Sequence, residues 1–280
     1  MLRGLAIVLA IQLIGPVDQM HAHIIRLQNI LFNRWGRQAN VKPSNWAVDF
    51  FLRLFGRIPA PVLHNLGKAS MIKRCMWHLN VDQIEGSYVE FGVAFGHSMR
   101  AAEIAERSSH LNSFGIRRIH RKLIGFDTFS QFLSDNPKDN HMTWSGPAFN
   151  IPLKKVEHRF SRDLGKRIFL NQQDATKLVD SEGKVLLAHE NFGLDGPIAL
   201  LLLDMDLYEP TIAALRWSRS RIQSGTIIFA DEYFAFCGRT DRGEALAIKE
   251  FLHENPEISL RQFGYYGAGG AVFIVSANSN

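Results

Sequence analysis

The sequence predicts an α/β protein with a doubly wound, mostly parallel sheet of seven strands, preceded by a helical extension. From Ser87 onward, short apolar runs alternate with helical stretches, which is the pattern of parallel βαβ units. A glycine-punctuated turn follows the first apolar run, as in the first βα unit of such a sheet. The last two runs are separated only by 264–270, which leaves no room for a crossover helix. We therefore expect those two strands to pair antiparallel.

Residues 1–81 contain no convincing strand, and we expect an N-terminal helical extension there, followed by a second domain over 82–280. Helices are expected over Asn45–Phe55 and Lys68–Leu79, with prolines as breaks between them. Such an extension could serve as a lid or a dimerisation arm, and we expect a homo-oligomer. The apolar run Leu5–Ile14 is too short to span a bilayer, although a signal or membrane-associated segment stays open. We expect this run to pack on the protein or on a partner subunit and not to be cleaved.

Seven short apolar runs are the candidate strands of the second domain, and helical patterns fill several of the gaps between them. The strands are Tyr88–Val93, Leu123–Phe126, Arg167–Leu170, Ile198–Leu203, Thr226–Ala230, Ile258–Phe263 and Ala271–Val275. Helices are expected over Met99–His110, Glu209–Ile222 and Thr240–His253. The longest connection, 130–165, is typical of a lid at the edge of a cofactor site.

Composition limits the kind of protein that this can be. The chain has 280 residues, of which 46% are hydrophobic, and this is ample for a large core. The net charge of +5 is mildly basic, and its cluster over His110–Lys122 is most simply a solvated helix end or loop. No RNA-binding signature accompanies it, so we expect no nucleic-acid partner. Cys75 and Cys237 make neither a disulfide framework nor a zinc site, and we expect both to be buried free thiols of a cytoplasmic protein.

The glycine-punctuated turn after the first strand is the first candidate site. Gly92 and Gly96 would let the backbone approach a ligand, which the N-terminus of the next helix would face. The spacing Glu-x-Gly-x-x-x-Gly is one residue longer than that of the usual dinucleotide turn. Glu90 adds a carboxylate, which would repel a pyrophosphate but suit a cationic ligand such as S-adenosylmethionine (SAM). The turn alone does not decide whether a cofactor binds.

Acidic residues at the ends of the next two strands extend this site. Because the carboxyl ends of parallel strands meet at one edge of a sheet, these side chains should converge. Asp127 ends the second strand, where a carboxylate binds ribose hydroxyls in nucleoside sites. Asp174 follows the third strand beside Ala175, near the expected adenine, although it could equally cap the following helix. The predicted cofactor residues are Glu90, Gly92, Gly96, Ser98, Asp127, Asp174 and Ala175.

Two acidic pairs follow the fourth and fifth strands. Asp204 and Asp206 end one strand, and Asp231 and Glu232 end its neighbour. Like charges gathered this closely in a buried place are costly unless a cation offsets them. A hard divalent cation with oxygen ligands, such as magnesium, would do so. The alternative is that the first pair caps a helix and the second is solvated, but two pairs on adjacent strand ends favour a metal site.

Four segments together resemble the macrocin O-methyltransferase family. They are Glu90-Phe-Gly-Val, Phe126-Asp-Thr-Phe, Leu203-Asp-Met-Asp-Leu-Tyr-Glu-Pro-Thr211 and Asp231-Glu-Tyr. The resemblance runs from about Asp82 to Ser276. It implies a class I enzyme that uses SAM and magnesium to methylate sugar hydroxyls in natural-product biosynthesis. By position it also implies that Asp204, Asp231 and Glu232 hold the metal while Asp206 acts as the general base.

The chain departs from the family pattern at three places. Glu232 stands where the family usually has aspartate, and His97 stands where a second glycine is common. After Phe129 the sequence reads Ser-Gln-Phe-Leu in place of the usual Glu-Gly-Leu-Pro. We therefore expect an intact metal site and an altered acceptor pocket.

The chemistry expected from these groups is methyl transfer to a hydroxyl. A metal that polarises the hydroxyl, with Asp206 accepting its proton, would make the oxygen nucleophilic at neutral pH. Adjacent hydroxyls could chelate the ion together, which favours sugars, glycosides or catechols as acceptors. Two other functions stay open, a nicotinamide-dependent oxidoreductase and a non-catalytic methyltransferase-like binding protein. His189 is a weaker candidate base, because it precedes the fourth strand at the opposite end of the sheet.

Overall fold

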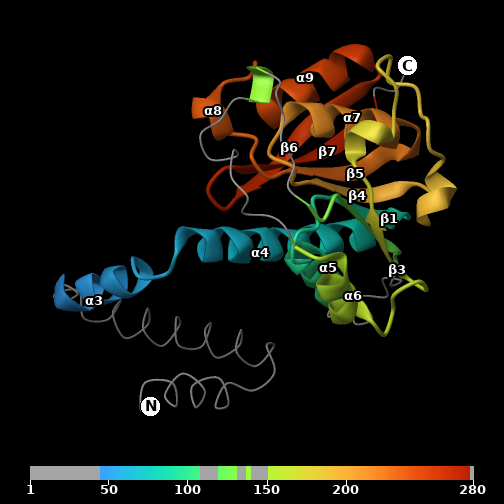
Figure 1. The fold of residues 1–280 in the computed structure, drawn as a ribbon. Helices are drawn as coiled ribbons and strands as arrows, with labels where there is room; N and C mark the ends of the chain where they lie inside the picture. The colour runs from blue at the N-terminus through green and yellow to red at the C-terminus, as the bar shows by residue number, and fades with distance from the viewer. Residues whose placement is uncertain (1–44, 108–118, 131–136, 140–150, 278–280) are drawn as a thin grey trace. The chain divides into compact units, whose positions relative to one another are not determined.

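The computed structural model describes residues 45–107, 119–130, 137–139 and 151–277 (Figure 1). The chain divides into two compact units, Met1–Pro59 and Ala60–Asn280. In the first unit, α3 (Asn45–Phe55) is the helix expected from the sequence. In the second, α4 (Ala60–Val81) joins the sheet domain, so the domain boundary expected near residue 81 stays a prediction. The apolar run Leu5–Ile14 lies outside the described residues.

The second unit is built on one sheet of seven strands, which confirms the predicted fold class. The strands are β1 (Ser87–Phe91), β2 (Leu123–Asp127), β3 (Ile168–Gln172), β4 (Ile198–Leu203), β5 (Ile222–Ala230), β6 (Ile258–Tyr266) and β7 (Gly270–Ala277). Their order is β3-β2-β1-β4-β5-β7-β6. The first five are parallel to one another, whereas β7 is antiparallel to both β5 and β6. The short connection between β6 and β7 therefore makes the hairpin that the sequence predicts.

Most predicted helices are present, with some shifts at their ends. The helices of the second unit are α4, α5 (His97–Arg107), α6 (Leu153–Phe160), α7 (Tyr208–Ser218), α8 (Ala235–Gly238) and α9 (Gly243–Glu254). α4 begins eight residues before the predicted Lys68, because Pro61 lies in its first turn, where a proline costs no hydrogen bond. α6 was not expected, since we interpreted 130–165 as one long connection. Its buried residues Val156 and Phe160 tie this segment to the core, so this part of it is not a lid.

Helices cover both faces of the sheet (Figure 1). On one face, residues of α4 and α5 such as Met76 and Met99 share a buried core with Leu200 and Leu202 of β4. On the other face, α7 and α9 share a core with Leu201 and Leu203 of the same strand. Successive strand side chains point to opposite faces, so a continuous apolar run such as β4 supplies both cores.

The same alternation decides where the acidic residues after β4 and β5 lie. Leu202 faces the core that α4 shares, and Asp204 is two residues further on, so it emerges on the α4 side. Leu203 lies beside Ala230 in the register of β4 and β5, which makes Asp231 the neighbour of Asp204. α4 is therefore the helix that meets this pair.

Two expectations about which residues are exposed are wrong. Arg121, expected in a solvated segment, is only 2% exposed, because it donates hydrogen bonds to the Gly86 carbonyl at 3.1 Å and to Asn80 Oδ1 at 3.3 Å. Cys75 is buried as expected, but Cys237 is exposed. The basic cluster is thus partly structural, because the guanidinium of Arg121 ties β2 to the end of α4 and to the start of β1.

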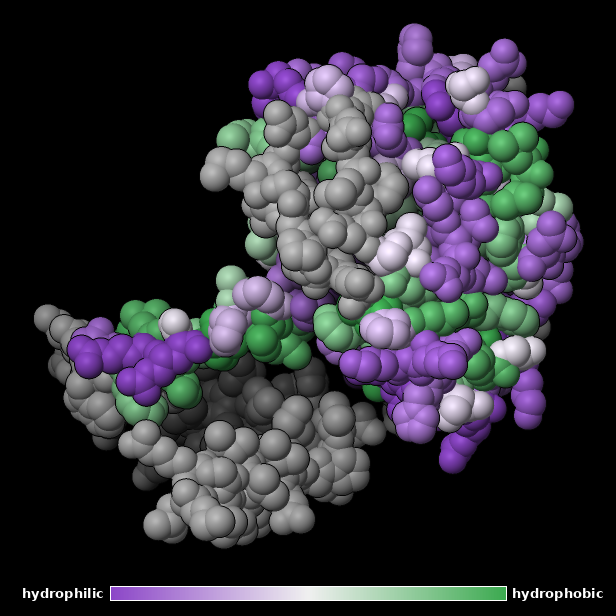
Figure 2. Space-filling model, viewed as in Figure 1, coloured by the Kyte–Doolittle hydropathy of each residue, from purple (hydrophilic) through white to green (hydrophobic). Residues whose placement is uncertain are grey.

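The face of the molecule drawn in Figure 2 mixes hydrophilic and hydrophobic residues, with hydrophilic ones covering much of the second unit. Exposed apolar side chains occur at the start of α4, at Val62, Leu63 and Leu66. Within the described segments, no helix combines the length and the apolar character needed to cross a membrane.

Candidate active site

A cavity of about 740 Å³ lies where the carboxyl ends of β1, β2, β4 and β5 meet α4. Ligand pockets commonly have volumes of ~300–1,000 Å³, so this one has room for a cofactor and part of an acceptor. Most of the predicted cofactor residues line it, as do all four acidic residues at the ends of β4 and β5. The predicted residues on its wall are Gly92, Ser98, Asp127, Asp174, Ala175, Asp204, Asp206, Asp231 and Glu232.

Gly92 fixes the distance between β1 and β4 at the cavity edge. Its φ of 91° is in the left-handed region, and a Cβ there would lie 1.8 Å from the Asp204 carbonyl oxygen. The Asp204 amide donates to the Phe91 carbonyl at 2.9 Å, which holds the two strand ends together. Gly96 also has a positive φ, of 72°, but it packs against Phe160 and does not line the cavity.

Asp127 is held as a hydrogen-bond acceptor beside the glycine turn. Its Oδ2 accepts from the Ala94 amide at 2.7 Å, and its Oδ1 accepts from the Phe129 amide at 2.6 Å. Burial raises the pKa of Asp127, and backbone hydrogen bonds from Ala94, Phe129 and Val93 oppose the rise. A carboxylate has about four acceptor sites, so the side chain can still accept from a hydroxyl of a ligand.

Asp174 has both of the roles that the sequence left open. Its Oδ1 accepts from the Thr176 amide at 2.9 Å and from the Thr176 hydroxyl at 2.7 Å, which caps the short helical turn Ala175–Lys177. It also lines the cavity with Ala175. Capping therefore fixes Asp174 in place at the wall of the site.

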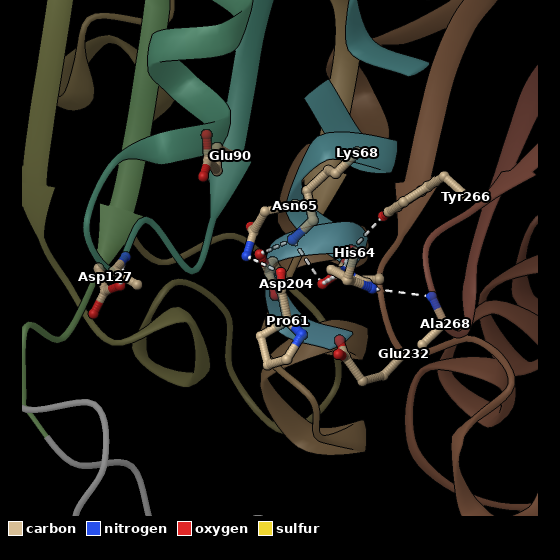
Figure 3. A network of polar contacts seen from close by, with 12 residues as sticks. Pro61, His64, Asn65, Lys68, Glu90, Asp127, Asp204, Glu232, Tyr266 and Ala268 are labelled. Carbon is tan, nitrogen blue, oxygen red and sulfur yellow. Dashed lines mark hydrogen bonds and ion pairs between the residues drawn. The ribbon is translucent and has the colours of Figure 1, made fainter. Parts of the chain in front are cut away.

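Glu90 lies behind the cavity wall instead of on it. Its side chain is 1% exposed and accepts a hydrogen bond from the Tyr88 hydroxyl at 2.5 Å. Burial raises the pKa of Glu90 to about 8, although the Tyr88 hydrogen bond and the charge of Lys68 oppose the rise. Figure 3 draws Glu90 apart from the cluster around Lys68, so the structure does not bring this predicted cofactor residue to the cavity.

A lysine from α4 contacts one carboxylate of each acidic pair, and Figure 3 shows it extending toward Asp204. Lys68 Nζ donates to Asp204 Oδ2 at 2.7 Å and to Asp231 Oδ2 at 2.7 Å, and the residue is 4% exposed. Burial alone would lower the pKa of Lys68, but the two carboxylates outweigh it and raise the pKa well above its ordinary value. The lysine is therefore a charged ammonium ion at neutral pH.

Asp231 is almost fully satisfied by groups of the protein. Besides Lys68, its oxygens lie 3.0 and 3.1 Å from His64 Nε2, and Oδ1 accepts from the Tyr266 hydroxyl at 2.5 Å. The Ala268 amide donates to His64 Nδ1 at 3.2 Å, so in the neutral ring the proton is on Nε2 and points to Asp231. Burial would raise the pKa of Asp231, but His64 and Lys68 lower it to about 2.

Asp204, Asp206 and Glu232 form the group that can share a cation. One carboxylate oxygen from each lies within 4.8 Å of the other two. Asp206 has a φ of 65°, unusual for a residue other than glycine, and shares a side-chain hydrogen bond with Glu232. Burial raises the pKa of Asp206 to about 6, with a further rise from Asp231. Burial also raises the pKa of Glu232, as do its four acidic neighbours, Asp231, Asp206, Asp204 and Glu244.

The arrangement fits a divalent cation next to Lys68. Glu232 Oε2 is buried and accepts no hydrogen bond from the described part of the chain. A buried carboxylate oxygen without a donor is costly, and an oxygen-preferring cation such as Mg²⁺ would satisfy it together with Asp204. The Glu232 amide donates to Glu244 Oε2 at 3.0 Å, which fixes the backbone of this residue. Asp231 is not in this group, and its oxygens are held by three protein donors, Lys68, His64 and Tyr266.

The capping alternative for the first acidic pair is wrong. The N-terminus of α7 is capped by Asp139, which accepts from the Tyr208 amide, and neither Asp204 nor Asp206 has this role. His189 is buried, and its Nε2 lies 2.7 Å from the Trp217 carbonyl, so it is occupied within the core.

Helix α4 and the β6–β7 hairpin also contribute side chains to this site, which the sequence did not predict. His64 and Lys68 are four residues apart and so lie on one face of α4, which is the face that meets the acidic cluster. Tyr266 and Ala268 come from the hairpin. The one available signal was the excess of predicted buried carboxylates, which requires cations from elsewhere in the chain. His97, one of the departures from the family pattern, also lines the cavity.

Comparison with known proteins gives both a family and a fold. The sequence profile of the family described as Macrocin-O-methyltransferase (TylF) matches residues 4–255. The solved structure of CalS11, described as a calicheamicin methyltransferase, is 24% identical with a TM-score of 0.53, over 86% of this chain and 90% of that one. The O-methyltransferase NovP is 17% identical with a TM-score of 0.54, over 74% and 79%. Both likenesses show the class I methyltransferase fold. Among curated proteins, none matches this chain.

Replacing Glu90 by glutamine should flatten the pH dependence of stability. The pKa of Glu90 is about 8 in the folded chain and 4.5 ordinarily, so the folded chain holds this proton more tightly than the unfolded chain does. The stability that the proton contributes is fully present below the ordinary pKa and is lost as pH rises through the folded pKa of about 8. Between about pH 5 and pH 8, wild type should lose on the order of 1 kcal/mol per pH unit relative to Glu90→Gln. Urea unfolding at several pH values measures this, with exposed Glu182→Gln as the control. Parallel curves for wild type and Glu90→Gln would contradict the prediction.

Proposed function

Because this chain belongs to the macrocin-O-methyltransferase family and is an O-methyltransferase, we propose that it moves the methyl group of SAM to a hydroxyl of a sugar or another vicinal diol. The acceptor would be a natural product or glycoside, and magnesium would assist. The observation that carries this proposal is the meeting of Asp204, Asp206 and Glu232 in one cavity with the glycine turn and Asp127. Membership in an enzyme family sets aside the oxidoreductase and the non-catalytic binding protein.

SAM would occupy the side of the cavity formed by the ends of β1, β2 and β3. There the backbone of the turn from Gly92 to Ser98 borders the cavity, and Asp127 offers free lone pairs to the ribose hydroxyls. Asp174 and Ala175 line the place expected for the adenine. The carboxylates of β4 and β5 lie on the other side, where a hydroxyl that accepts the methyl group would have to bind.

Asp204 and Glu232 would hold the magnesium ion. Bound there, a divalent cation would polarise the oxygen of the acceptor's hydroxyl and stabilise its negative charge. The family resemblance also implied that Asp231 binds this ion. Its contacts with His64, Lys68 and Tyr266 support a different role, in which Asp231 is the counter-ion of Lys68 on α4. Two adjacent hydroxyls on the acceptor would suit a site in which few ligands come from the protein.

Asp206 would accept the proton from the hydroxyl. Its carboxylate lies within 4.8 Å of those of Asp204 and Glu232. A hydroxyl bound to a metal ion at Asp204 and Glu232 would therefore lie beside Asp206. With a pKa of about 6, Asp206 is mostly ionised at neutral pH yet basic enough to take a proton. The hydroxyl oxygen would then be able to attack the methyl carbon of SAM, with the bond from sulfur to that carbon breaking and S-adenosylhomocysteine as the leaving product. Activity should fall as pH decreases through about 6, because protonated Asp206 cannot act as a base.

Replacing Asp127 by alanine should weaken SAM binding at least tenfold, or about 1.4 kcal/mol. The change removes the acceptor for ribose and also frees the amides of Ala94 and Phe129, which shape the turn. Isothermal titration calorimetry with SAM measures the effect, with exposed Asp49→Ala as the control. An unchanged affinity would remove Asp127 from the cofactor site.

Replacing Asp206 by asparagine should lower turnover by roughly 10²–10⁴ while SAM affinity stays near that of wild type. Asparagine keeps the size of the side chain but cannot take the proton. Methyl transfer from radiolabelled SAM to a panel of glycosides and catechols gives the rate, and calorimetry gives the SAM affinity. Asp49→Asn is the matched control. Turnover within threefold of wild type would show that Asp206 is not the base.

A further inference from the structure

Helix α4 supplies the acidic centre with two side chains, His64 and Lys68, that the proposed chemistry does not use. Lys68 is the buried cation of this centre, and it touches one carboxylate from each acidic pair. It reaches them from a helix 136 and 163 residues away along the chain. In Figure 3 it extends from α4 toward the ends of β4 and β5, on the same helix face as His64. The fold thus brings a positive charge to the place where the sequence predicts a metal.

The contacts of Lys68 make Asp231 unavailable to a second cation. Asp231 Oδ2 accepts from Lys68 and lies near His64, while Oδ1 accepts from Tyr266 and lies near His64 as well. A metal ion that ligated Asp231 would have to replace one of these donors, and it would lie within a few ångströms of the Lys68 ammonium. Two cations that close repel each other strongly in a poorly solvated site.

We propose that Lys68 is the resident cation of the acidic centre and sets its affinity for divalent metal. Lys68 neutralises Asp231, keeps it from ligating the metal, and holds Asp204 in place through Oδ2. The metal is then limited to Asp204 Oδ1 and the oxygens of Glu232, beside the base Asp206, and it binds more weakly than it would with Asp231 as a further ligand. The inference rests on the proposed function in one respect, that a divalent ion binds at these carboxylates.

A merely structural lysine predicts the opposite change on removal. If Lys68 only tied α4 to the sheet, its loss would loosen the carboxylates and weaken metal binding. If it is the resident cation, its loss frees Asp231 and removes a repelling charge, so metal should bind more tightly. The sign of the change in affinity separates the two roles, and enzyme activity is not needed to read it.

The experiment compares Mn²⁺ binding, used as a probe for Mg²⁺, by the full-length chain without SAM. Titration calorimetry gives the affinity, and the electron paramagnetic resonance of free Mn²⁺ gives the number bound. Lys68→Met should bind Mn²⁺ at least tenfold more tightly than wild type. Lys68→Arg keeps the charge and should stay within threefold of wild type. Lys73→Met removes an exposed charge from the same helix and is the matched control, which should not differ from wild type.

A second variant keeps the inference testable if unpaired carboxylates stop Lys68→Met from folding. The double variant Lys68→Met with Asp231→Asn removes one charge of each sign, and it should bind Mn²⁺ within threefold of wild type. If Asp231 ligates the metal in the wild type, the double variant should instead lose at least tenfold. Equal or weaker binding by Lys68→Met would also overturn the inference. If neither wild type nor any variant binds Mn²⁺, both this inference and the proposed metal are contradicted. If all of them bind Mn²⁺ equally, only the role of Lys68 is contradicted.

Discussion

The need to compensate buried negative charge governs this site. Asp204, Asp206, Asp231 and Glu232 converge at the ends of two adjacent strands, and Glu244 lies directly behind them. Carboxylates held this close in a poorly solvated place cannot all remain charged without cations. Among the residues that the structure describes, Lys68 supplies an ammonium ion that pairs with two of the five, Asp204 and Asp231. Burial and the neighbouring carboxylates still raise the pKa values of Asp204, Asp206, Glu232 and Glu244, although Lys68 opposes the rise at Asp204 and Asp206, so a further cation would stabilise their charged forms.

Simple features of the fold create this concentration of charge. The parallel strands β4 and β5 end at the same edge of the sheet, and their register makes Asp204 and Asp231 neighbours on the face that α4 covers. Gly92 has no Cβ, so the end of β1 can contact the backbone of Asp204. The glycine turn that begins at Gly92 and the acidic pairs therefore border one cavity. A carboxylate that repels its neighbours in the free enzyme is well placed to bind a cation and to take a proton when the acceptor arrives.

The sequence predicted much of this, because the relevant signals are local. The β4 run and the Asp-x-Asp that follows it locate a strand end, and the spacing of Gly92 and Gly96 locates the turn. Glu90 lies behind the cavity wall, and the sequence pattern could not show this, because it cannot tell a residue on the wall from one just behind it. Lys68, His64 and Tyr266 were missed because their partners are far away in sequence: Asp231 is 163 residues from Lys68 and 167 from His64. No local periodicity reports which helix lies over which strand end.

The central claim is that these carboxylates and a divalent cation together activate a hydroxyl for methylation by SAM. The most direct measurement is methyl transfer from radiolabelled SAM to one glycoside with adjacent hydroxyls, in excess Mg²⁺ and again in a strong chelator. A deoxy analogue of the same glycoside, lacking the neighbouring hydroxyl, runs in parallel. The account predicts methylation of the diol in Mg²⁺, its loss in chelator with recovery on adding Mg²⁺ back, and poor methylation of the analogue. Full methylation of the diol in the chelator would contradict it.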